Sequence, residues 1–265
     1  MLRSRAVRRL LARLVLSLLL LAILLIAGSA RLPASFVAPL LRSSKSVLWV
    51  IAHPDDESFF FAPSIIGLRA ASPSIHASIL CLSVGNHDGL GEVRRAELLK
   101  SCSQLNIPSE RCIALDLPSL PDSPAVWWAP DEVASIVRNY IEQWDVDAVI
   151  SFDQYGVSGH ANHQALGSAL AEVVRFDRKF PPVFAVHSTN LLAKFSSFLF
   201  LPVAVARHFA RRTGSSSSLF INSWAQYRQT RRSFSAHASQ ARWFRTLFVS
   251  FSRYLWFVRL ERVLP

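Results

Sequence analysis

A cluster of ionisable side chains directly follows an apolar run in the first quarter of the chain. Residues 46–52 read SVLWVIA, and the next five residues, HPDDE, include His53, Asp55, Asp56 and Glu57. All four can bind a metal or move a proton, and their mutual repulsion is costly unless a cation or a proton relieves it. Their types and spacing therefore indicate a metal site or an acid–base site.

A second polar cluster follows another apolar run about a hundred residues later. Residues 147–153 read DAVISFD and lead into a glycine-rich loop that carries His160 and His163. Both apolar runs are typical of buried parallel strands, and open α/β sheets place their ligands at the carboxyl ends of such strands. The two loops can therefore meet and supply imidazole and carboxylate ligands, leaving one position open for water.

Each of these residues also has a structural interpretation. Asp55 or Asp56 could cap the helix that follows, and a lone histidine is more often structural than catalytic. Neither an HxxH pattern nor a pair of aspartates is a specific signal alone. Their joint presence at two strand ends favours a metal site, and imidazole with carboxylate suits both zinc and Fe(II).

Strand-like and helix-like patterns alternate through the middle of the chain. Strands are predicted at 46–52, 77–84, 112–115, 146–152 and 183–187, and helices at 56–71, 92–105, 131–144 and 161–176. Strands that alternate with helices are typical of a parallel sheet covered on both faces. We therefore predict an α/β fold with a Rossmann-like, doubly wound and mostly parallel sheet.

The alternation stops after residue 189. Residues 195–206 are apolar, contain a proline and are too short to span a bilayer, which leaves an interfacial patch or a core segment. Residues 211–218 read as a polar break. Residues 225–263 read as a helical segment that mixes arginine with Trp, Phe and Leu. This segment either packs on the domain as an amphipathic helix or lies on a membrane.

The N-terminus indicates a membrane anchor. Five arginines stand in the first thirteen residues, and residues 14–30 carry no charge, which is close to the length of a short transmembrane helix. A cleaved signal peptide is the alternative, because the residues AGSA at 27–30 could serve as a cleavage site. We favour a retained anchor, because Cys81, Cys102 and Cys112 read as buried free thiols of a reducing compartment.

Charge divides the chain into three parts. Residues 1–45 hold eight Arg or Lys and no acid, residues 46–205 hold ten basic and seventeen acidic residues, and residues 206–265 hold eleven Arg and one acid. Basic segments that are interleaved with apolar residues suit an anionic membrane face, and no nucleic-acid-binding motif accompanies them. The expected organisation is an anchor at 1–30, a linker at 31–45, a catalytic domain at 46–190 and a membrane-proximal C-terminal part at 191–265.

Four motifs together resemble one known family. They are AHPDDE, SVGNHDGLGEVRRAEL, SFDxxGVSGHxNHxA and AHxSQxxWFRxLFxxFSRY, and the resemblance spans residues 46–257. They resemble PIG-L, the N-acetylglucosaminyl-phosphatidylinositol de-N-acetylases among the LmbE-like deacetylases. The resemblance implies metal-dependent deacetylation of a glycolipid in GPI-anchor synthesis. It also implies a single-pass protein of the endoplasmic reticulum membrane with its catalytic domain on the cytoplasmic face, whereas the positive-inside rule predicts the opposite orientation.

The resemblance also implies roles for the ionisable residues. His53, Asp56 and His163 would bind a divalent metal, for which zinc is expected. Asp55 would be the general base that takes a proton from the attacking water. His160 would stabilise the oxyanion as an imidazolium and help to protonate the leaving amine.

Other residues are candidates for binding the substrate. Arg94 would line the pocket by resemblance, where a guanidinium binds phosphate or hydroxyl groups, although a helix-face pair with Glu97 is the alternative. Asn86, Asp88 and Asp122 are candidate ligands of sugar hydroxyls.

Two residues are candidates for supporting the site. Glu57 either orients His53 or is a first-turn acid of the following helix. His237, in the fourth motif, is expected to be structural or membrane-proximal rather than catalytic.

Two rival functions remain open at this point. One is an LmbE-type deacetylase that acts on a soluble N-acetyl-sugar conjugate, with an apolar tail that serves packing alone. The other is a non-catalytic, membrane-tethered module that has kept the fold. The intact HPDDE and HxxH motifs argue against the second, because a module freed from chemistry need not keep them.

Overall fold

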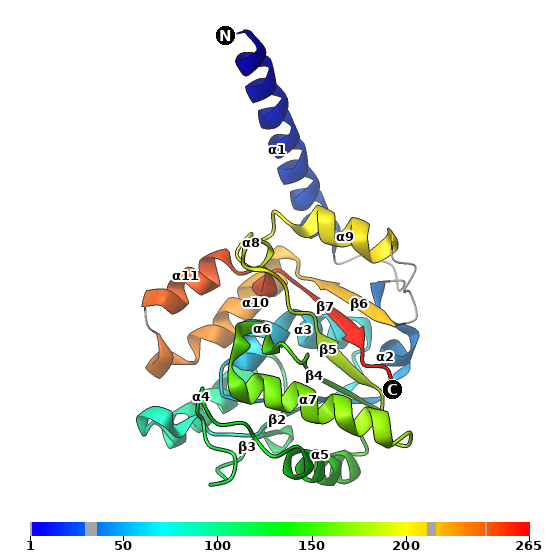
Figure 1. The fold of residues 1–265 in the computed structure, drawn as a ribbon, viewed down its shortest axis with the longest axis vertical. Helices are drawn as coiled ribbons and strands as arrows, with labels where there is room; N and C mark the ends of the chain where they lie inside the picture. Colours follow the sequence, from blue (N-terminus) through cyan, green and yellow to red (C-terminus); the bar gives the residue numbers. More distant parts are fainter. Residues whose placement is uncertain (1, 30–35, 211–215, 242) are drawn as a thin grey trace.

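A seven-stranded sheet forms the centre of the computed structural model, which describes residues 2–29, 36–210, 216–241 and 243–265 (Figure 1). The strand order is β3-β2-β1-β4-β5-β7-β6, in which β7 runs antiparallel to both of its neighbours, β5 and β6, and the first five strands pair in parallel. The strands are β1 (Ser46–Ile51), β2 (His76–Cys81), β3 (Cys112–Ala114), β4 (Ala148–Phe152), β5 (Val183–Val186), β6 (Ser217–Ile221) and β7 (Phe257–Arg262). The prediction of a mostly parallel α/β sheet is confirmed.

The pairing of β1 with β4 brings the two polar clusters together. Every residue of both strands is buried, as expected of parallel strands whose two faces are covered. The chain runs from β1 outward to β2 and β3, and it returns to place β4 on the other side of β1. Such a reversal of strand order creates a crevice at the carboxyl ends of the two strands, where α/β proteins bind ligands.

Helices cover both faces of the sheet. On one face α3 and α4 pack with α10, and on the other α5 packs with α7 (Figure 1). These helices are α3 (Ala62–Ala71), α4 (Gly91–Gln104), α10 (Trp224–Ser235), α5 (Pro130–Trp144) and α7 (Ala161–Phe176). The predicted helices at 92–105, 131–144 and 161–176 are therefore present. The helix expected from residue 56 begins as a π-helical turn, Glu57–Phe61, whose three phenylalanines are buried.

The prediction of one long helical segment at 225–263 is wrong in part. The segment contains α10, a short α11 (Trp243–Phe251) and then β7, which pairs with both β5 and β6. Residues 257–260 of β7 are buried, and Arg259 forms an ion pair with Glu261 at 2.8 Å. Tertiary pairing on both sides thus outweighs the basic composition that favoured a helix. The expected break at 211–218 lies mostly outside the described residues, and Ser217 and Ser218 belong to β6.

The expectation of three free thiols is also wrong. Cys102, near the end of α4, is joined by a disulfide to Cys112 at the start of β3, while Cys81 is free and buried. The two bonded cysteines come together because α4 packs against β3. Disulfides form in oxidising compartments, so the cysteines no longer support a reducing environment or a retained anchor.

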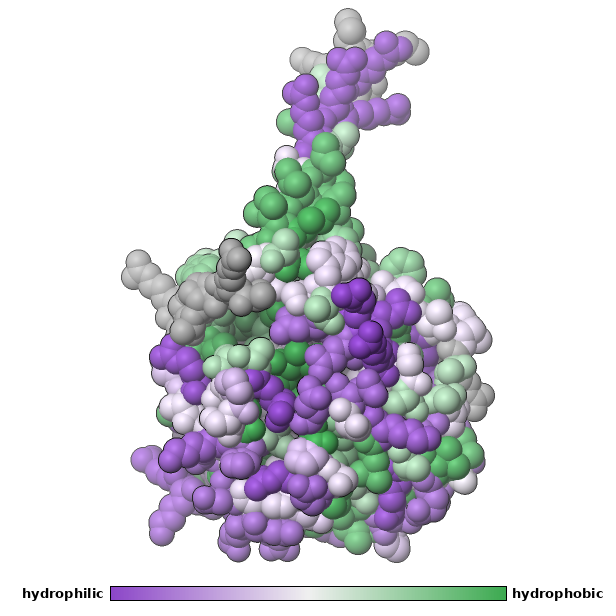
Figure 2. Space-filling view, turned by 180° about the vertical axis from the view of Figure 1, so that it is seen from behind, coloured by the Kyte–Doolittle hydropathy of each residue, from purple (hydrophilic) through white to green (hydrophobic). Residues whose placement is uncertain are grey.

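A long helix projects from the body of the protein. It is α1 (Leu2–Gly28), and residues 5–28 are long and apolar enough to cross a membrane (Figure 1). Figure 2 shows hydrophobic surface along its shaft and hydrophilic surface at its far end. Its base packs on α9 (Leu201–Ala210), where Ile26 and Leu201 are buried in one cluster. Part of the apolar segment predicted at 195–206 is therefore core.

Candidate active site and metal centre

The loops after β1 and β4 bring His53, Asp56 and His163 together. The Nδ1 atom of His53 lies 3.3 Å from Nε2 of His163, and that Nε2 lies 3.3 Å from Oδ1 of Asp56. Oδ2 of Asp56 is 4.0 Å from Nδ1 of His53. All three side chains are buried. The three ligands predicted by resemblance thus point their donor atoms at one small volume.

Hydrogen bonds on the far side of each imidazole set its tautomer. Nε2 of His53 faces two acceptors, Oδ1 of Asn162 at 3.0 Å and Oδ1 of Asp122 at 3.1 Å. Nδ1 of His163 faces the carbonyl oxygen of Gly156 at 3.1 Å. These nitrogens therefore carry the hydrogens, and the inward nitrogens present lone pairs. Two lone pairs and a carboxylate that converge in this way fit a divalent cation.

The carboxylate of Asp56 is fixed by the end of β1. Its Oδ2 accepts hydrogen bonds from the backbone amides of Ala52 and His53, at 3.1 and 2.9 Å, and it caps no helix. Burial alone would raise the pKa of Asp56, but His163 and His53 outweigh it and hold that pKa well below its ordinary value. Burial lowers the pKa of His53 to about 4. The set is thus a carboxylate with at least one neutral imidazole, as a metal requires.

Asp55 stands beside this set in an unusual conformation. Its φ is 120°, a value that side-chain-bearing residues rarely adopt. Its carboxylate is buried and accepts a hydrogen bond from Arg245 of α11, whose guanidinium lies 5.3 Å from the ring centre of Phe59. Burial raises the pKa of Asp55 to about 6, against the lowering effect of Arg245. A carboxylate with a pKa near working pH is suited to general base catalysis.

His160 completes a second possible donor set. It is partly exposed, and its ring centre lies 4.8 Å from that of His53 and 5.2 Å from that of His163. Potential ligand atoms of these three histidines all lie within 4.8 Å of one another. Nδ1 of His160 accepts the backbone amide of Asn162 at 3.3 Å, which leaves Nε2 toward the cavity. Burial lowers the pKa of His160, which opposes the imidazolium form expected there.

Arg94 and Asp122 form an ion pair at the rim of the site. The Nη1 atom of Arg94 lies 3.0 Å from Oδ2 of Asp122 and 2.8 Å from the carbonyl oxygen of Gly85. Gly85 has a φ of 73°, and a Cβ there would lie 2.3 Å from the Arg94 guanidinium. Glu97 instead accepts hydrogen bonds from Ser239. The helix-face alternative for Arg94 is therefore wrong, and Arg94 faces the site.

Asn86 and Asp88 lie apart from this group. Both are exposed, and neither lines the cavity described below. Oδ1 of Asn86 accepts the backbone amide of Gly91 at 2.9 Å, which positions the start of α4. The structure therefore gives Asn86 a local structural contact and brings neither residue to the predicted metal ligands.

Glu57 contacts the backbone of Asp55 rather than a predicted ligand. Its fully buried carboxylate accepts hydrogen bonds from the backbone amide of Asp55 at 3.0 Å and from Ser101, and it pairs with Nε2 of His237 at 2.7 Å. Its contacts thus differ from the expected one with His53. His237 is buried and contacts Glu57 rather than the predicted metal ligands.

A cavity of about 410 Å³ lies at the predicted metal ligands. Its walls include the predicted ligands and base together with Arg94 and Asp122. They also include four residues that the sequence reasoning did not single out: Ser158, Lys194, Arg245 and Phe248. Ser158, Arg245 and Phe248 stand within the third and fourth motifs without an assigned role, whereas Lys194 lies outside all four motifs.

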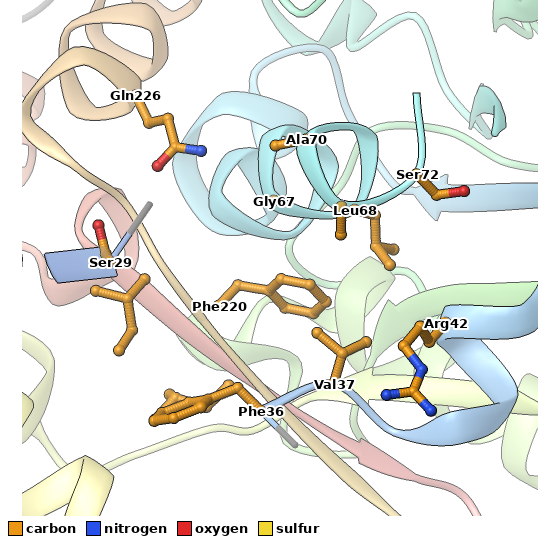
Figure 3. A pocket seen from close by; sticks show the side chains of 13 residues that line it. Ser29, Phe36, Val37, Arg42, Gly67, Leu68, Ala70, Ser72, Phe220 and Gln226 are labelled. Atoms are coloured by element: carbon orange, nitrogen blue, oxygen red, sulfur yellow. The ribbon is translucent and has the colours of Figure 1, made fainter. Parts of the chain in front are cut away.

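A second cavity, of about 280 Å³, lies below the projecting helix. Figure 3 shows Phe220 of β6 between α3 and Val37, with Arg42 at one side. A Cβ at Gly67 would lie 2.7 Å from the Phe220 ring, so a glycine is needed where α3 passes this ring. None of the predicted site residues lines this cavity, and it is separate from the candidate active site.

Comparison with solved structures identifies the fold. The N,N'-diacetylchitobiose deacetylase from Pyrococcus horikoshii gives a TM-score of 0.56 at 13% identity, covering 84% of this chain and 82% of that one. A zinc-inhibited teicoplanin deacetylase gives a TM-score of 0.55 at 13% identity, covering 82% and 97%. The fold is like that of the LmbE-like deacetylases.

Comparison with sequences identifies the family within that class. Residues 48–174 match the PIG-L family, described as GlcNAc-PI de-N-acetylase. The chain is 39% identical over 211 residues to the N-acetylglucosaminyl-phosphatidylinositol de-N-acetylase of Bos taurus, covering 78% of this chain and 79% of the relative. It is 35% identical over 217 residues to a probable enzyme of the same name from Schizosaccharomyces pombe, covering 80% and 84%. The chain belongs to the PIG-L family.

The pair of His237 and Glu57 yields a stability prediction. Changing His237 to Ala leaves the fully buried carboxylate of Glu57 without its imidazole, so we expect the free energy of unfolding to fall by about 3–5 kcal/mol. Denaturant unfolding in detergent measures the loss. The control is Glu92→Ala, which breaks the exposed pair with Arg95 and should cost less than about 1 kcal/mol. Equal losses in the two variants would contradict a supporting role for His237.

Proposed function

We propose that this chain hydrolyses the acetamide of N-acetylglucosaminyl-phosphatidylinositol, giving acetate and glucosaminyl-phosphatidylinositol in GPI-anchor synthesis. The observation that carries the proposal is the convergence of His53, Asp56 and His163 beside Asp55, at one cavity of a PIG-L family chain. Amide hydrolysis needs a polarised carbonyl, an activated water and a protonated leaving amine, and this donor set offers groups for each need.

We infer that zinc is the metal and that Nδ1 of His53, Nε2 of His163 and the Asp56 carboxylate hold it. Bound zinc supplies a Lewis acid that polarises a carbonyl and lowers the pKa of water. The chain keeps the donors aligned, because Asn162 holds His53 and the carbonyl of Gly156 holds His163. Asp56 is preferred to His160 as the third ligand because it is buried and held by two backbone amides.

The remaining side chains supply proton transfer and binding. Asp55, held by the contact of its backbone with Glu57, accepts the proton of the attacking water. His160 donates a hydrogen bond from Nε2 to the oxyanion, and the proton that Asp55 takes from the water passes to the leaving amine. Arg94 and Asp122, which share an ion pair at the rim, bind sugar hydroxyls. With the acetamide between Asp55 and His160, the water that Asp55 activates attacks the carbonyl carbon, and His160 faces the oxygen of the same carbonyl.

We also infer that α1 remains in the mature protein as a single-pass anchor in the endoplasmic reticulum membrane, with the catalytic domain on the cytoplasmic face. The lipid substrate requires a site held at a bilayer surface, and the basic C-terminal part suits an anionic leaflet. The disulfide and the arginine-rich N-terminus favour the opposite face.

Protease treatment of sealed microsomes tests this orientation. A tag after residue 265 should be cleaved without detergent, because the catalytic domain lies outside the vesicle. A lumenal marker protein in the same vesicles should stay intact until detergent is added. Protection of the tag alongside that marker would place the domain in the lumen and contradict the proposed face.

Acetate release by the purified protein in detergent tests the proposed reaction. We expect release from N-acetylglucosaminyl-phosphatidylinositol that a chelator abolishes and added zinc restores, because the ligands hold the metal reversibly. Bound metal without release from this lipid, but with release from a soluble N-acetyl-sugar conjugate, would contradict the lipid substrate. Absence of both metal and release would leave the non-catalytic module as the better account.

Two kinds of variant separate the ligands from the base. Asp55→Asn keeps the size of the side chain and removes its basicity, so it should retain metal while turnover falls by about 10²–10⁴-fold. His53→Ala and His163→Ala should lose metal and turnover together. Metal content by atomic emission and initial rates of acetate release give the two readouts. Equal metal loss in all three variants would contradict the assignment of Asp55 as the base.

A further inference from the structure

A buried lysine on the cavity wall has no role in the chemistry above. Lys194 ends the short helix α8 (Leu191–Lys194), is 7% exposed and lines the cavity that contains the predicted ligands. Its Nζ donates to the carbonyl oxygen of Val157 at 3.1 Å and lies 5.7 Å from the ring centre of Phe248. Among the described residues no carboxylate lies within ion-pair distance of this ammonium.

Lys194 differs in this respect from the other basic side chains of the cavity. Among the described residues three Lys or Arg side chains line it, namely Arg94, Arg245 and Lys194. Arg94 is paired with Asp122, and Arg245 with Asp55. An ammonium has three donors, and the carbonyl of Val157 uses one. Lys194 therefore keeps hydrogen-bonding capacity and an uncompensated charge at the cavity.

An isolated buried ammonium is costly, and an anion relieves the cost. Transfer of a charge out of water is unfavourable unless the charge is paired and hydrogen-bonded. Burial accordingly lowers the pKa of Lys194. Two aromatic rings flank Nζ, with the ring centres of Phe195 and Phe248 at 5.6 and 5.7 Å.

The local backbone fixes the ammonium in place. Oδ1 of Asn190 accepts the amide of Ala193 at 2.9 Å and caps α8. Val157 has φ 57° and ψ −46°, a conformation that β-branched residues rarely adopt. Its amide donates to Oγ of Ser188 at 2.8 Å while its carbonyl accepts from Lys194. Contacts on both sides of a strained residue thus position Nζ, as expected of a binding group.

We propose that Lys194 binds the phosphodiester of the phosphatidylinositol headgroup while the acetamide of the same substrate lies at His53, Asp56 and His163. This proposal rests on the proposed function, from which the substrate class is taken. A phosphodiester carries one negative charge and offers anionic oxygens that accept from an ammonium. Lys194 would thus distinguish the glycolipid from N-acetyl sugars without phosphate.

The test compares two substrates, of which only the first carries the phosphodiester and its diacylglycerol. They are N-acetylglucosaminyl-phosphatidylinositol and N-acetylglucosaminyl-inositol, assayed with the full chain in detergent. Lys194→Met removes the charge and keeps the length of the side chain, so KM for the first substrate should rise about tenfold to a hundredfold, the effect of one charge-assisted hydrogen bond. The values of kcat for that substrate and of kcat/KM for the second should stay within about twofold.

Two further variants and a binding measurement complete the design. Lys194→Arg keeps the charge and should restore most of the affinity, whereas Lys100→Met removes an exposed charge on α4 and should change neither constant. Calorimetric titration with glycerophosphoinositol, and separately with inorganic phosphate, measures anion binding without turnover. The wild-type protein should bind glycerophosphoinositol more tightly than inorganic phosphate, and Lys194→Met should lose this binding.

The outcomes distinguish this proposal from the proposed function. Equal loss on both substrates, or unchanged binding of glycerophosphoinositol, would overturn the role of Lys194. Equal binding of inorganic phosphate and glycerophosphoinositol would mean a general anion site and overturn the headgroup assignment. Headgroup binding that depends on Lys194, without acetate release from either substrate, would uphold this inference and reject the deacetylase function.

Discussion

The parallel pairing of β1 with β4 is the constraint on which the rest of the site depends. Its register places Val47 beside Ala148 and Trp49 beside Ile150, so the two strands end together. The residues that follow them then meet, although His53 and His163 are 110 positions apart. A shift of either strand by one residue would reverse the direction of its side chains. Hydrogen bonds near both ends of the pair hold this register, because Oγ of Ser151 donates to the carbonyl oxygen of Val50 and the carboxylate of Asp147 accepts the backbone amide of Ser46.

Around this edge of the sheet, buried carboxylates accept hydrogen bonds from residues in a distant part of the chain. Asp55 is bound by Arg245, Glu57 by His237, and Glu97 by Ser239. All three partners lie in the segment that joins β6 to β7. The C-terminal part therefore neutralises and orients the groups that the first half supplies, which explains why it packs on the site rather than standing apart as a membrane helix.

The sequence was sufficient to predict the parts of the fold that local patterns specify. Continuous apolar runs predicted β1 and β4, and the helical periodicity of 92–105 predicted α4. The same reasoning failed for β7, because its strand character comes from pairing with β5 and β6 rather than from composition. It also failed for Cys102 and Cys112, because a separation of ten residues does not reveal that α4 packs on β3.

Prediction at the site had the same limit. The residue types and spacing of HPDDE and HxxH favoured a metal site, and the structure brings together His53, Asp56 and His163, the ligands that the resemblance implied. Asn162 and Arg245 stand within the motifs, but their contacts, like that of Lys194, are formed across the tertiary structure, so spacing did not reveal them. Asn86 was a plausible hydroxyl ligand by type, yet its side chain accepts the amide of Gly91 at the start of α4.

Anomalous scattering at the zinc edge, from crystals of the metal-loaded full chain, tests the central claim most directly. The account predicts one peak coordinated by Nδ1 of His53, Nε2 of His163 and the carboxylate of Asp56, at about 2.0–2.2 Å from each. The peak should leave His160 uncoordinated and Asp55 free of the metal. A peak held by His53, His160 and His163 with Asp56 outside the coordination sphere, or no peak at these residues, would contradict it.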